Sequence, residues 1–346
     1  MEQVKYNFSL KNIPIPRQKD YLLELIYSVG FFVSNLRWRT FFFLNPSNYE
    51  KKETFGFKTT KPAPSISELK NFEDDLFELV KNVKFCQTKQ NNLQSTLKEN
   101  IRELNNSNLI YVAADKSDKH YKVTKDKHDE MMKKNITKDY KKTNVNDVDK
   151  VNKTDKKIAE NYDLENRIYT FPPREAYITI KDHKENYETN TKFRLINPAK
   201  TDMGKISKKV LSKIVTSLRN LNIFNQWQNS HSVLEWFKNL QNKDNLCFIQ
   251  FDIVEFYPSI TESILKKSID FARRYVKISD DEAKAILDTK KSLLFNIGQF
   301  WEKKGRRPFD VTMGSWDGAE VADLVGLYLL SQLQDLDLNI GLYRDD

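Results

Sequence analysis

Acidic residues that end two apolar segments are the side chains of this sequence best suited to chemistry. Asp252 follows the run Phe248-Ile-Gln-Phe251, and Asp345 and Asp346 follow the run Ile340-Gly-Leu-Tyr343. An ionised carboxylate at the end of a buried strand is costly unless it is hydrogen-bonded or coordinates a metal. Magnesium takes such oxygen ligands together with substrate phosphates, with manganese as an alternative ion. The two segments therefore favour a metal site.

Three carboxylates brought together would hold two ions roughly 3.5–4 Å apart and support in-line phosphoryl transfer. Each segment also has a simpler interpretation when it is taken alone. Asp252 would merely open a turn, and the pair Asp345 and Asp346 would be a solvated chain end. Histidine and cysteine offer no alternative metal site, because the 4 histidines and 2 cysteines lack metal-ligand spacing.

The elements that would position these carboxylates follow from apolar patterning and helix caps. We expect a buried strand over 246–253, then a helix over about 260–275 with Ser259 and Glu262 as its capping box. Ser279 and Glu282 predict a second capped helix. The remaining expected elements are strands at 176–181, 192–197 and 340–343, helices at 205–221 and 319–333, and a hairpin at 299–311.

The rest of the chain is less informative. Aromatic residues crowd positions 1–55 and are interpreted as core, a linker at 61–65 precedes a helical run over 67–84, and the charge-rich stretch 116–160 is interpreted as solvated faces or loops. A net charge of +9 and a pI near 9.1 favour a polyanionic partner, although a lysine-rich proteome would explain them equally well. We expect an intracellular protein, nuclear or cytoplasmic, without signal peptide, transmembrane segment or membrane partner.

Together the two acidic segments resemble motifs A and C of the reverse transcriptases, whose palm carries one aspartate on a strand and a Y-x-D-D turn on a neighbouring hairpin. The segment Met313-Gly-Ser-Trp-Asp-Gly-Ala-Glu320 resembles motif B, a glycine-bearing turn that enters a helix. Asp317 stands where many members have Gln, and the usual Ser-Pro is absent. The resemblance covers about residues 177–346.

The resemblance implies roles for particular residues. Asp252, Asp345 and Asp346 would be the catalytic metal ligands for two Mg²⁺ ions. The strand-turn-strand at 176–197 looks like the fingertip hairpin that meets the incoming triphosphate. The substrate-binding residues implied are Lys181, Lys184 and Arg194 at the triphosphate, Tyr257 beneath the sugar, and Asp317 and Gly318 at the template and nucleotide. Their simpler alternatives are a surface hairpin with ordinary basic residues and a core aromatic at Tyr257.

The segment Val112-Ala-Ala-Asp-Lys116 resembles the A-D-K segment of Penelope-like retroelement enzymes. The Phe-Tyr-Pro-Ser-Ile form of motif A also occurs in retron-like and group II-like branches, so the subfamily stays open. We expect an α+β fold with right-hand polymerase fingers and a partial palm. The expected regions are a mostly helical N-terminal accessory region over 1–110, fingers over 111–245, and a palm over 246–346 that carries motifs A, B and the start of C.

The function that this resemblance implies is RNA-directed DNA polymerisation, with an RNA template, a DNA primer and deoxynucleoside triphosphates as partners. The expected copy is incomplete, because the thumb is absent and the sequence stops at the second aspartate of the Y-x-D-D motif. The alternatives are a catalytically inactive nucleic-acid-binding remnant of a retroelement and a viral RNA-dependent RNA polymerase. The last more often shows G-D-D and lacks an aromatic residue at the position of Tyr257.

Overall fold

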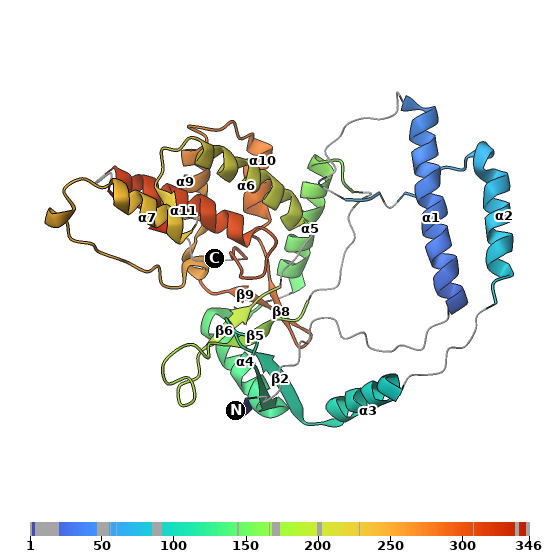
Figure 1. Cartoon of the computed structure of the whole chain (residues 1–346), viewed down its shortest axis with the longest axis horizontal. Coiled ribbons are helices and arrows are strands. Elements are labelled where there is room, and N and C mark those ends of the chain that lie inside the picture. The colour runs from blue at the N-terminus through green and yellow to red at the C-terminus, as the bar shows by residue number, and fades with distance from the viewer. Residues whose placement is uncertain are drawn as a thin grey trace. The chain divides into compact units, whose positions relative to one another are not determined.

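The computed structural model describes residues 2–3, 21–46, 55, 57–59, 61–84, 92–143, 145–165, 167, 174–198, 203–227, 229–306, 308–335 and 339–343. It is a mixed α+β structure, and Figure 1 labels its elements. The chain divides into two compact units, of which the first comprises residues 1–112 and 117–128 and the second residues 113–116 and 129–346. No helix in the described ranges is long and apolar enough to cross a membrane.

The first unit contains a helix pair and a small sheet. Its elements are β1 (Glu2–Gln3), α1 (Tyr21–Leu44), η2 (Ser67–Leu69), α2 (Lys70–Lys81), α3 (Asn92–Asn106), β2 (Leu109–Ala113) and β3 (His120–Thr124), with sheet order β1-β3-β2. α1 packs on α2, where Arg37 Nε donates to Glu73 Oε1 at 2.6 Å. That hydrogen bond lowers the pKa of the buried Glu73 carboxyl.

The second unit begins with α4 (Lys125–Asp139), whose first turn groups with the first unit. Its further helices are α5 (Val145–Asn161), α6 (Met203–Asn220), α7 (Ser230–Asn239), η3 (Lys243–Asn245), α8 (Phe256–Ser259), α9 (Glu262–Ala272), α10 (Asp280–Asp288) and α11 (Gly318–Gln334). Its core lies where α6, α9, α10 and α11 pack together (Figure 1). The fully buried Leu211, Leu265, Ile286 and Leu324 come from these four helices in turn.

Short strands complete the second unit. They are β4 (Tyr140–Lys142), β5 (Tyr177–Ile180), β6 (Phe193–Ile196), β7 (Gln226–Trp227), β8 (Leu294–Asn296), β9 (Gln299–Lys303) and β10 (Leu342–Tyr343). β4, β9 and β8 form an antiparallel sheet in that order, β5 and β6 form an antiparallel hairpin, and β10 pairs parallel with β7. The expected strands at 176–181 and 192–197 and the capping box of Ser279 and Glu282 are confirmed.

Four expectations are wrong. Residues 246–253 form no strand but an exposed irregular segment, because no described strand pairs with it. Thr261 rather than Ser259 caps α9, since Ser259 ends the short helix α8. The hairpin turns at Ile297 and Gly298, so it lies upstream of the expected one. In the stretch 116–160 the expectation of loops is wrong, because the stretch contains β3, α4, β4 and α5, whereas the expectation of solvated faces holds, because most of its described charged side chains are exposed.

The aromatic residues of α1 also differ from their interpretation as core. Phe31 is 57% exposed, Phe32 53% and Phe43 82%. Among the α1 side chains that the structure describes, only Val33, at 4% exposure, is fully buried. Within the described residues, the helix α1 therefore presents much of its aromatic surface to solvent.

Candidate functional site

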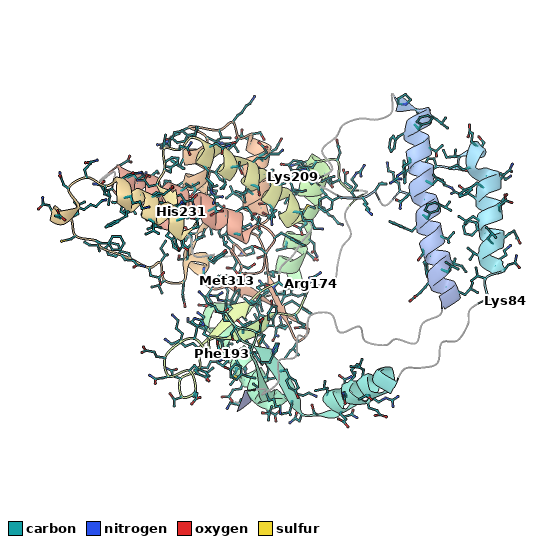
Figure 2. All side chains as sticks on the ribbon, in the orientation of Figure 1. Lys84, Arg174, Phe193, Lys209, His231 and Met313 are labelled. Atoms are coloured by element: carbon teal, nitrogen blue, oxygen red, sulfur yellow. The ribbon has the colours of Figure 1, made fainter. Side chains whose placement is uncertain are left out.

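The turn that resembles motif B lies directly against the end of the basic hairpin. Gly314 has φ +109°, a conformation that glycine adopts readily. A Cβ placed on it would lie 3.1 Å from the carbonyl oxygen of Asn197 and 3.1 Å from Cγ2 of Ile196. In Figure 2, Met313 marks this turn and Phe193 marks the strand β6 that leads to it. A larger residue at position 314 would push the turn and the hairpin apart.

Tyr257 packs at the start of α11, next to the second glycine of the same turn. A Cβ on Gly318 would lie 3.3 Å from Cε1 of Tyr257 and 3.0 Å from the carbonyl oxygen of Thr312. The short helix α8 that carries Tyr257 is held by Arg306, whose Nη1 donates to the carbonyl oxygens of Pro258 at 2.5 Å and Ile260 at 3.1 Å. The segments expected to be motif A and motif B therefore touch through Tyr257 and Gly318.

The hairpin itself is joined to the segment that resembles the A-D-K motif. Ala114 forms a parallel bridge with Ile180, and the Asp115 N–H donates to the Ile180 carbonyl oxygen at 2.8 Å. Thr179 and Arg194 are cross-strand partners in the hairpin, so their side chains leave the same face. The backbone contacts of Asp115 therefore hold its side chain beside those of Thr179 and Arg194.

Asp115 and Arg194 form a partly buried ion pair at this place. Arg194 Nη1 lies 3.2 Å from Asp115 Oδ1, and Thr179 Oγ1 donates to the same oxygen at 3.3 Å. The Asp115 side chain is 4% exposed and that of Arg194 28%. Asp115 Oδ2 and Arg194 Nε are buried and have no hydrogen-bond partner within the described residues. The carboxylate therefore holds one edge of the guanidinium, whose exposed part remains able to bind an anion.

Positive charge dominates around Lys181. Burial lowers the pKa of the Lys181 ammonium, the nearby charges of Arg194 and Lys184 lower it further, and the carboxylates of Asp115 and Glu255 oppose these effects. Lys181 is half-buried and Lys184 is exposed. A bound phosphate would offset the repulsion among the three cations. The hairpin is therefore suited to a multiply charged anion.

Glu255 relates this basic cluster to the segment that follows Asp252. Its carboxylate influences Lys181 electrostatically and lies 3.3 Å from the Lys138 ammonium of α4. Glu255 has φ +50°, a left-handed conformation at the entrance to α8. The region that resembles motif A therefore interacts electrostatically with the hairpin through Glu255, and it contacts the turn that resembles motif B through Tyr257.

The expected metal ligands are not assembled in the described residues. Asp252 is exposed within the irregular segment 246–253, and Asp345 and Asp346 lie outside the described ranges. Those ranges contain no group of three or more His, Cys, Asp or Glu side chains arranged to hold a metal. The geometry of the carboxylate cluster thus stays a prediction.

Asp317 was expected at the template, and its position corrects that expectation. Its side chain is 0% exposed and forms an ion pair with Lys290, which is 1% exposed. Thr289 Oγ1 donates to its second oxygen at 3.5 Å. A carboxylate enclosed by protein in this way stabilises the turn at 312–318 through its contacts with Lys290 and Thr289, and it does not reach a substrate. Gly318, next to it, lies against Tyr257, and its expected approach to the template and nucleotide stays a prediction.

Sequence reasoning missed Asp115, Lys290 and Arg306 as residues of this region. Asp115 stood in the A-D-K segment but received no role, because nothing local connects it with the hairpin. Lys290 and Arg306 gave no signal, since each acts through a contact far away along the chain. Gly314 and Gly318, in contrast, belong to the segment that resembles motif B, and they lie close to Asn197 and Tyr257 respectively.

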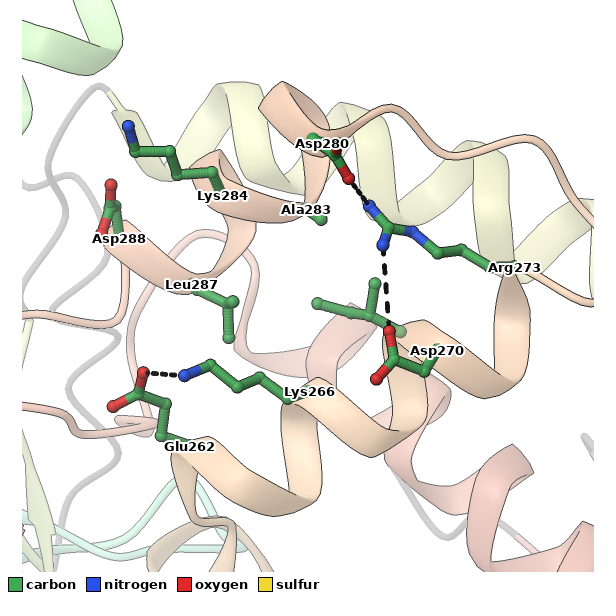
Figure 3. A pocket seen from close by; sticks show the side chains of 10 residues that line it. Glu262, Lys266, Asp270, Arg273, Asp280, Ala283, Lys284, Leu287 and Asp288 are labelled. Atoms are coloured by element: carbon green, nitrogen blue, oxygen red, sulfur yellow. Dashed lines mark hydrogen bonds and ion pairs between the residues drawn. The ribbon is translucent and has the colours of Figure 1, made fainter.

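A hollow between α9 and α10 offers no competing site. Figure 3 shows that its charged side chains largely pair with one another. Lys266 lies 2.7 Å from Glu262, and Arg273 lies 2.6 Å from Asp280 and 3.9 Å from Asp270. Because these opposite charges neutralise one another and are exposed to water, the hollow has little net electrostatic attraction for a charged ligand.

Comparisons of the chain with protein-family models, with curated proteins and with solved structures find no match.

Proposed function

We propose that this chain carries the fingers and part of the palm of an RNA-directed DNA polymerase. The observation that supports the proposal most is the convergence of three segments that are far apart in sequence. The basic hairpin 176–197 contacts the turn at Gly314, and the same turn contacts Tyr257 through Gly318. These are the segments that the resemblance assigns to the triphosphate, the template strand and the sugar of one nucleotide.

The proposed chemistry is attack of a primer 3′-hydroxyl on the α-phosphorus of a deoxynucleoside triphosphate, with pyrophosphate as the leaving group. Lys181, Lys184 and Arg194 would bind the phosphates and stabilise the negative charge on the leaving group. Tyr257 would lie beneath the sugar and exclude a 2′-hydroxyl. Its position against the backbone at Gly318 supports this, because a rigidly packed ring can exclude an added atom.

Magnesium ions, when bound, would neutralise phosphate charge during this transfer. The proposed ligands are Asp252, Asp345 and Asp346, of which only Asp252 belongs to the described residues. No step of the proposed nucleotide recognition depends on them. The basic hairpin and the Tyr257 ring would select the nucleotide by themselves.

Primer extension tests the proposal directly. The chain is incubated with an RNA template, an annealed DNA primer, magnesium and deoxynucleotides, beside the variants Asp252→Ala and Asp244→Ala. Asp244 is a matched control, because it is an exposed aspartate in the same region of the chain. We expect that any extension by the parent is kept in Asp244→Ala and lost in Asp252→Ala. Extension that Asp252→Ala leaves unchanged would contradict the assignment of the catalytic carboxylate.

A second candidate function is nucleic-acid binding without catalysis. The exposed, irregular setting of Asp252 favours it, because two-metal catalysis needs its ligands held within about 0.5 Å. Both functions predict binding to RNA through phosphates that weakens steeply between about 50 and 200 mM salt. A salt-sensitive complex without any primer extension would select the binding function, and a complex indifferent to salt would exclude both.

A further inference from the structure

The helix α8, which carries Tyr257, is too short to be stable by itself. It comprises only the four residues Phe256–Ser259, and a single helical turn is marginal in water. The chain that leads into it is also exposed, since Ile253 is 43% exposed and Val254 79%. The orientation of the Tyr257 ring therefore depends on the contacts that α8 makes with other segments.

The turn at the start of α8 provides only weak support. Glu255 has φ +50°, which is unfavourable for a residue with a large side chain. Its carboxylate lies 3.3 Å from the Lys138 ammonium, but the two side chains are 60% and 62% exposed. Exposed ion pairs contribute little to stability. The start of α8 is therefore easily displaced.

Arg306 makes a stronger contact at the end of α8. Its Nη1 donates to the carbonyl oxygens of Pro258 at 2.5 Å and Ile260 at 3.1 Å. Carbonyl groups at the end of a helix lack partners within it, and hydrogen bonds from a charged donor are about twice as strong as neutral ones. Ile260 is 1% exposed, so the contact lies beside the core. Arg306 therefore fixes the backbone directly after Tyr257.

Arg306 belongs to the chain segment that leads into the turn resembling motif B. Within this segment Asp310 is 5% exposed, and its N–H donates to the Lys290 carbonyl oxygen at 2.8 Å. Burial raises the pKa of the Asp310 carboxyl, and the positive charges of Lys303 and Arg306 are among the effects that oppose this rise. The guanidinium is thus near a buried carboxyl group whose backbone is bonded to the core.

The helix α8 therefore contacts the segment 306–318 at two places. Arg306 binds the backbone after Tyr257, and a Cβ on Gly318 would lie 3.3 Å from Cε1 of the Tyr257 ring. A ring that is supported at one place can tilt, whereas two contacts determine its position and its angle. Selection against a 2′-hydroxyl requires a ring that is held to within about 0.5 Å.

We propose that Arg306 is a positioning residue for sugar selection, which orients α8 so that the Tyr257 ring excludes a ribonucleotide. The inference rests on the proposed function, in which Tyr257 lies beneath the sugar of the incoming nucleotide. Arg306 contacts neither the sugar nor the phosphates in this arrangement and acts through the backbone of α8. Its removal should therefore change the preference between two nucleotides and leave the affinity for the preferred one nearly unchanged.

Competition binding to a complex that cannot extend its primer tests this role without requiring catalysis. The full chain, an RNA template and a dideoxy-terminated DNA primer bind a base-labelled deoxyadenosine triphosphate with magnesium, and unlabelled dATP or ATP displaces it. The variants are Arg306→Met, Arg306→Lys, Tyr257→Val and the double variant Tyr257→Val/Arg306→Met. Arg306→Gln replaces Arg306→Met if the latter does not fold.

Arg273→Met is the matched control for these variants. Arg273 follows α9 and also donates to a backbone carbonyl oxygen, that of Ser279 at 3.4 Å. Figure 3 shows its side chain beside Asp270 and Asp280, at the end of α9 opposite to α8. Its removal should leave the preference between dATP and ATP unchanged.

The expected result is a loss of preference without a loss of binding. Arg306→Met should lower the preference for dATP over ATP about tenfold. Arg306→Lys should keep most of the preference, because an ammonium also donates hydrogen bonds to carbonyl groups. The double variant should lose no more preference than Tyr257→Val, since residues that act through one another are not additive. Hydrogen exchange of the segment 255–261 should become faster in Arg306→Met.

Other outcomes would overturn the inference. Equal weakening of dATP and ATP by Arg306→Met would show that Arg306 only supports the fold. A larger loss of preference in the double variant than in Tyr257→Val would show that it acts independently of the ring. A parent that binds neither nucleotide, or both equally, would refute the proposed function and this inference with it. Preference that is lost in Tyr257→Val and kept in Arg306→Met would refute the inference alone.

Discussion

Arg194 on the strand β6 lies 3.2 Å from the buried carboxylate of Asp115, a residue that belongs to the loop after β2. The contact joins the two segments that resemble the fingertip hairpin and the A-D-K motif. A guanidinium held by a carboxylate has fewer rotamers to lose when it binds a phosphate, so the ion pair prepares Arg194 for its proposed role. Asp115 therefore acts as a positioning residue for the arginine.

This relationship predicts how variants bind a nucleotide. Arg194→Ala should weaken binding of a fluorescent deoxyadenosine triphosphate about 10- to 100-fold, the usual effect of losing hydrogen bonds to a charged group. Arg194→Lys should recover only part of the loss, since an ammonium cannot grip phosphate with two parallel hydrogen bonds. Lys133→Ala removes an exposed charge on α4 and serves as the control. Equal affinities for Arg194→Ala and Lys133→Ala would refute a triphosphate role for the hairpin.

Tyr257 packs against Gly318, which predicts a loss of sugar discrimination when the ring is removed. Tyr257→Val should raise incorporation of ribonucleotides relative to deoxynucleotides by about tenfold or more, because it opens space beneath the sugar. Primer extension with each nucleotide type measures the ratio. Tyr275→Val changes a tyrosine that follows α9 and contacts the rings of Phe224 and Phe271, and it provides an aromatic control. An unchanged ratio in Tyr257→Val would mean that the ring is only a packing residue.

Local sequence signals predicted a large part of the second unit. The apolar periodicity predicted the helix α6, and the reciprocal bonds of Ser279 and Glu282 start α10 where the capping box predicted it. The hairpin β5–β6 was predicted from β-branched residues that flank a polar turn. Each of these signals involves residues near one another along the chain, so no knowledge of the tertiary structure was needed.

Contacts between distant segments were the part that the sequence could not supply. The run Phe248-Ile-Gln-Phe251 has the composition of a strand, but a strand needs a neighbour to pair with, and composition does not provide one. In the charge-rich stretch 116–160, Met132 and Ile136 are buried one helical turn apart on α4. Two apolar residues among many charged ones gave too weak a periodic signal to predict that helix.

Removing one partner of the buried Lys290–Asp317 ion pair should destabilise the fold more than replacing both partners with apolar residues. Lys290→Met alone leaves an unpaired buried carboxylate and should reduce the free energy of unfolding by about 3–5 kcal/mol. The double variant Lys290→Met/Asp317→Leu removes both charges and should recover most of that loss. Urea unfolding followed by circular dichroism measures both. A double variant as unstable as the single one would show that the turn at 312–318 needs the ion pair itself.

The raised pKa of the Asp155 carboxyl on α5 predicts that the stability of the second unit depends on pH. Burial, and after it the negative charge of Asp288, raises the pKa of the Asp155 carboxyl from 3.8 to about 7. Asp288 also forms an ion pair with Lys291 at 2.5 Å. The folded protein therefore keeps the Asp155 proton over a pH range in which the unfolded chain has lost it.

The sign of the effect follows from this difference in proton binding. Between about pH 4 and 7 the folded state binds more protons than the unfolded state, so stability falls as pH rises and levels off above about pH 7. Asp155→Asn removes the titrating group and should raise the Tm more at pH 8 than at pH 5. Asp149→Asn alters an exposed residue of the same helix and is the control. An increase in Tm from Asp155→Asn that is equal at both pH values would contradict the link to ionisation, because an effect of packing alone does not depend on pH.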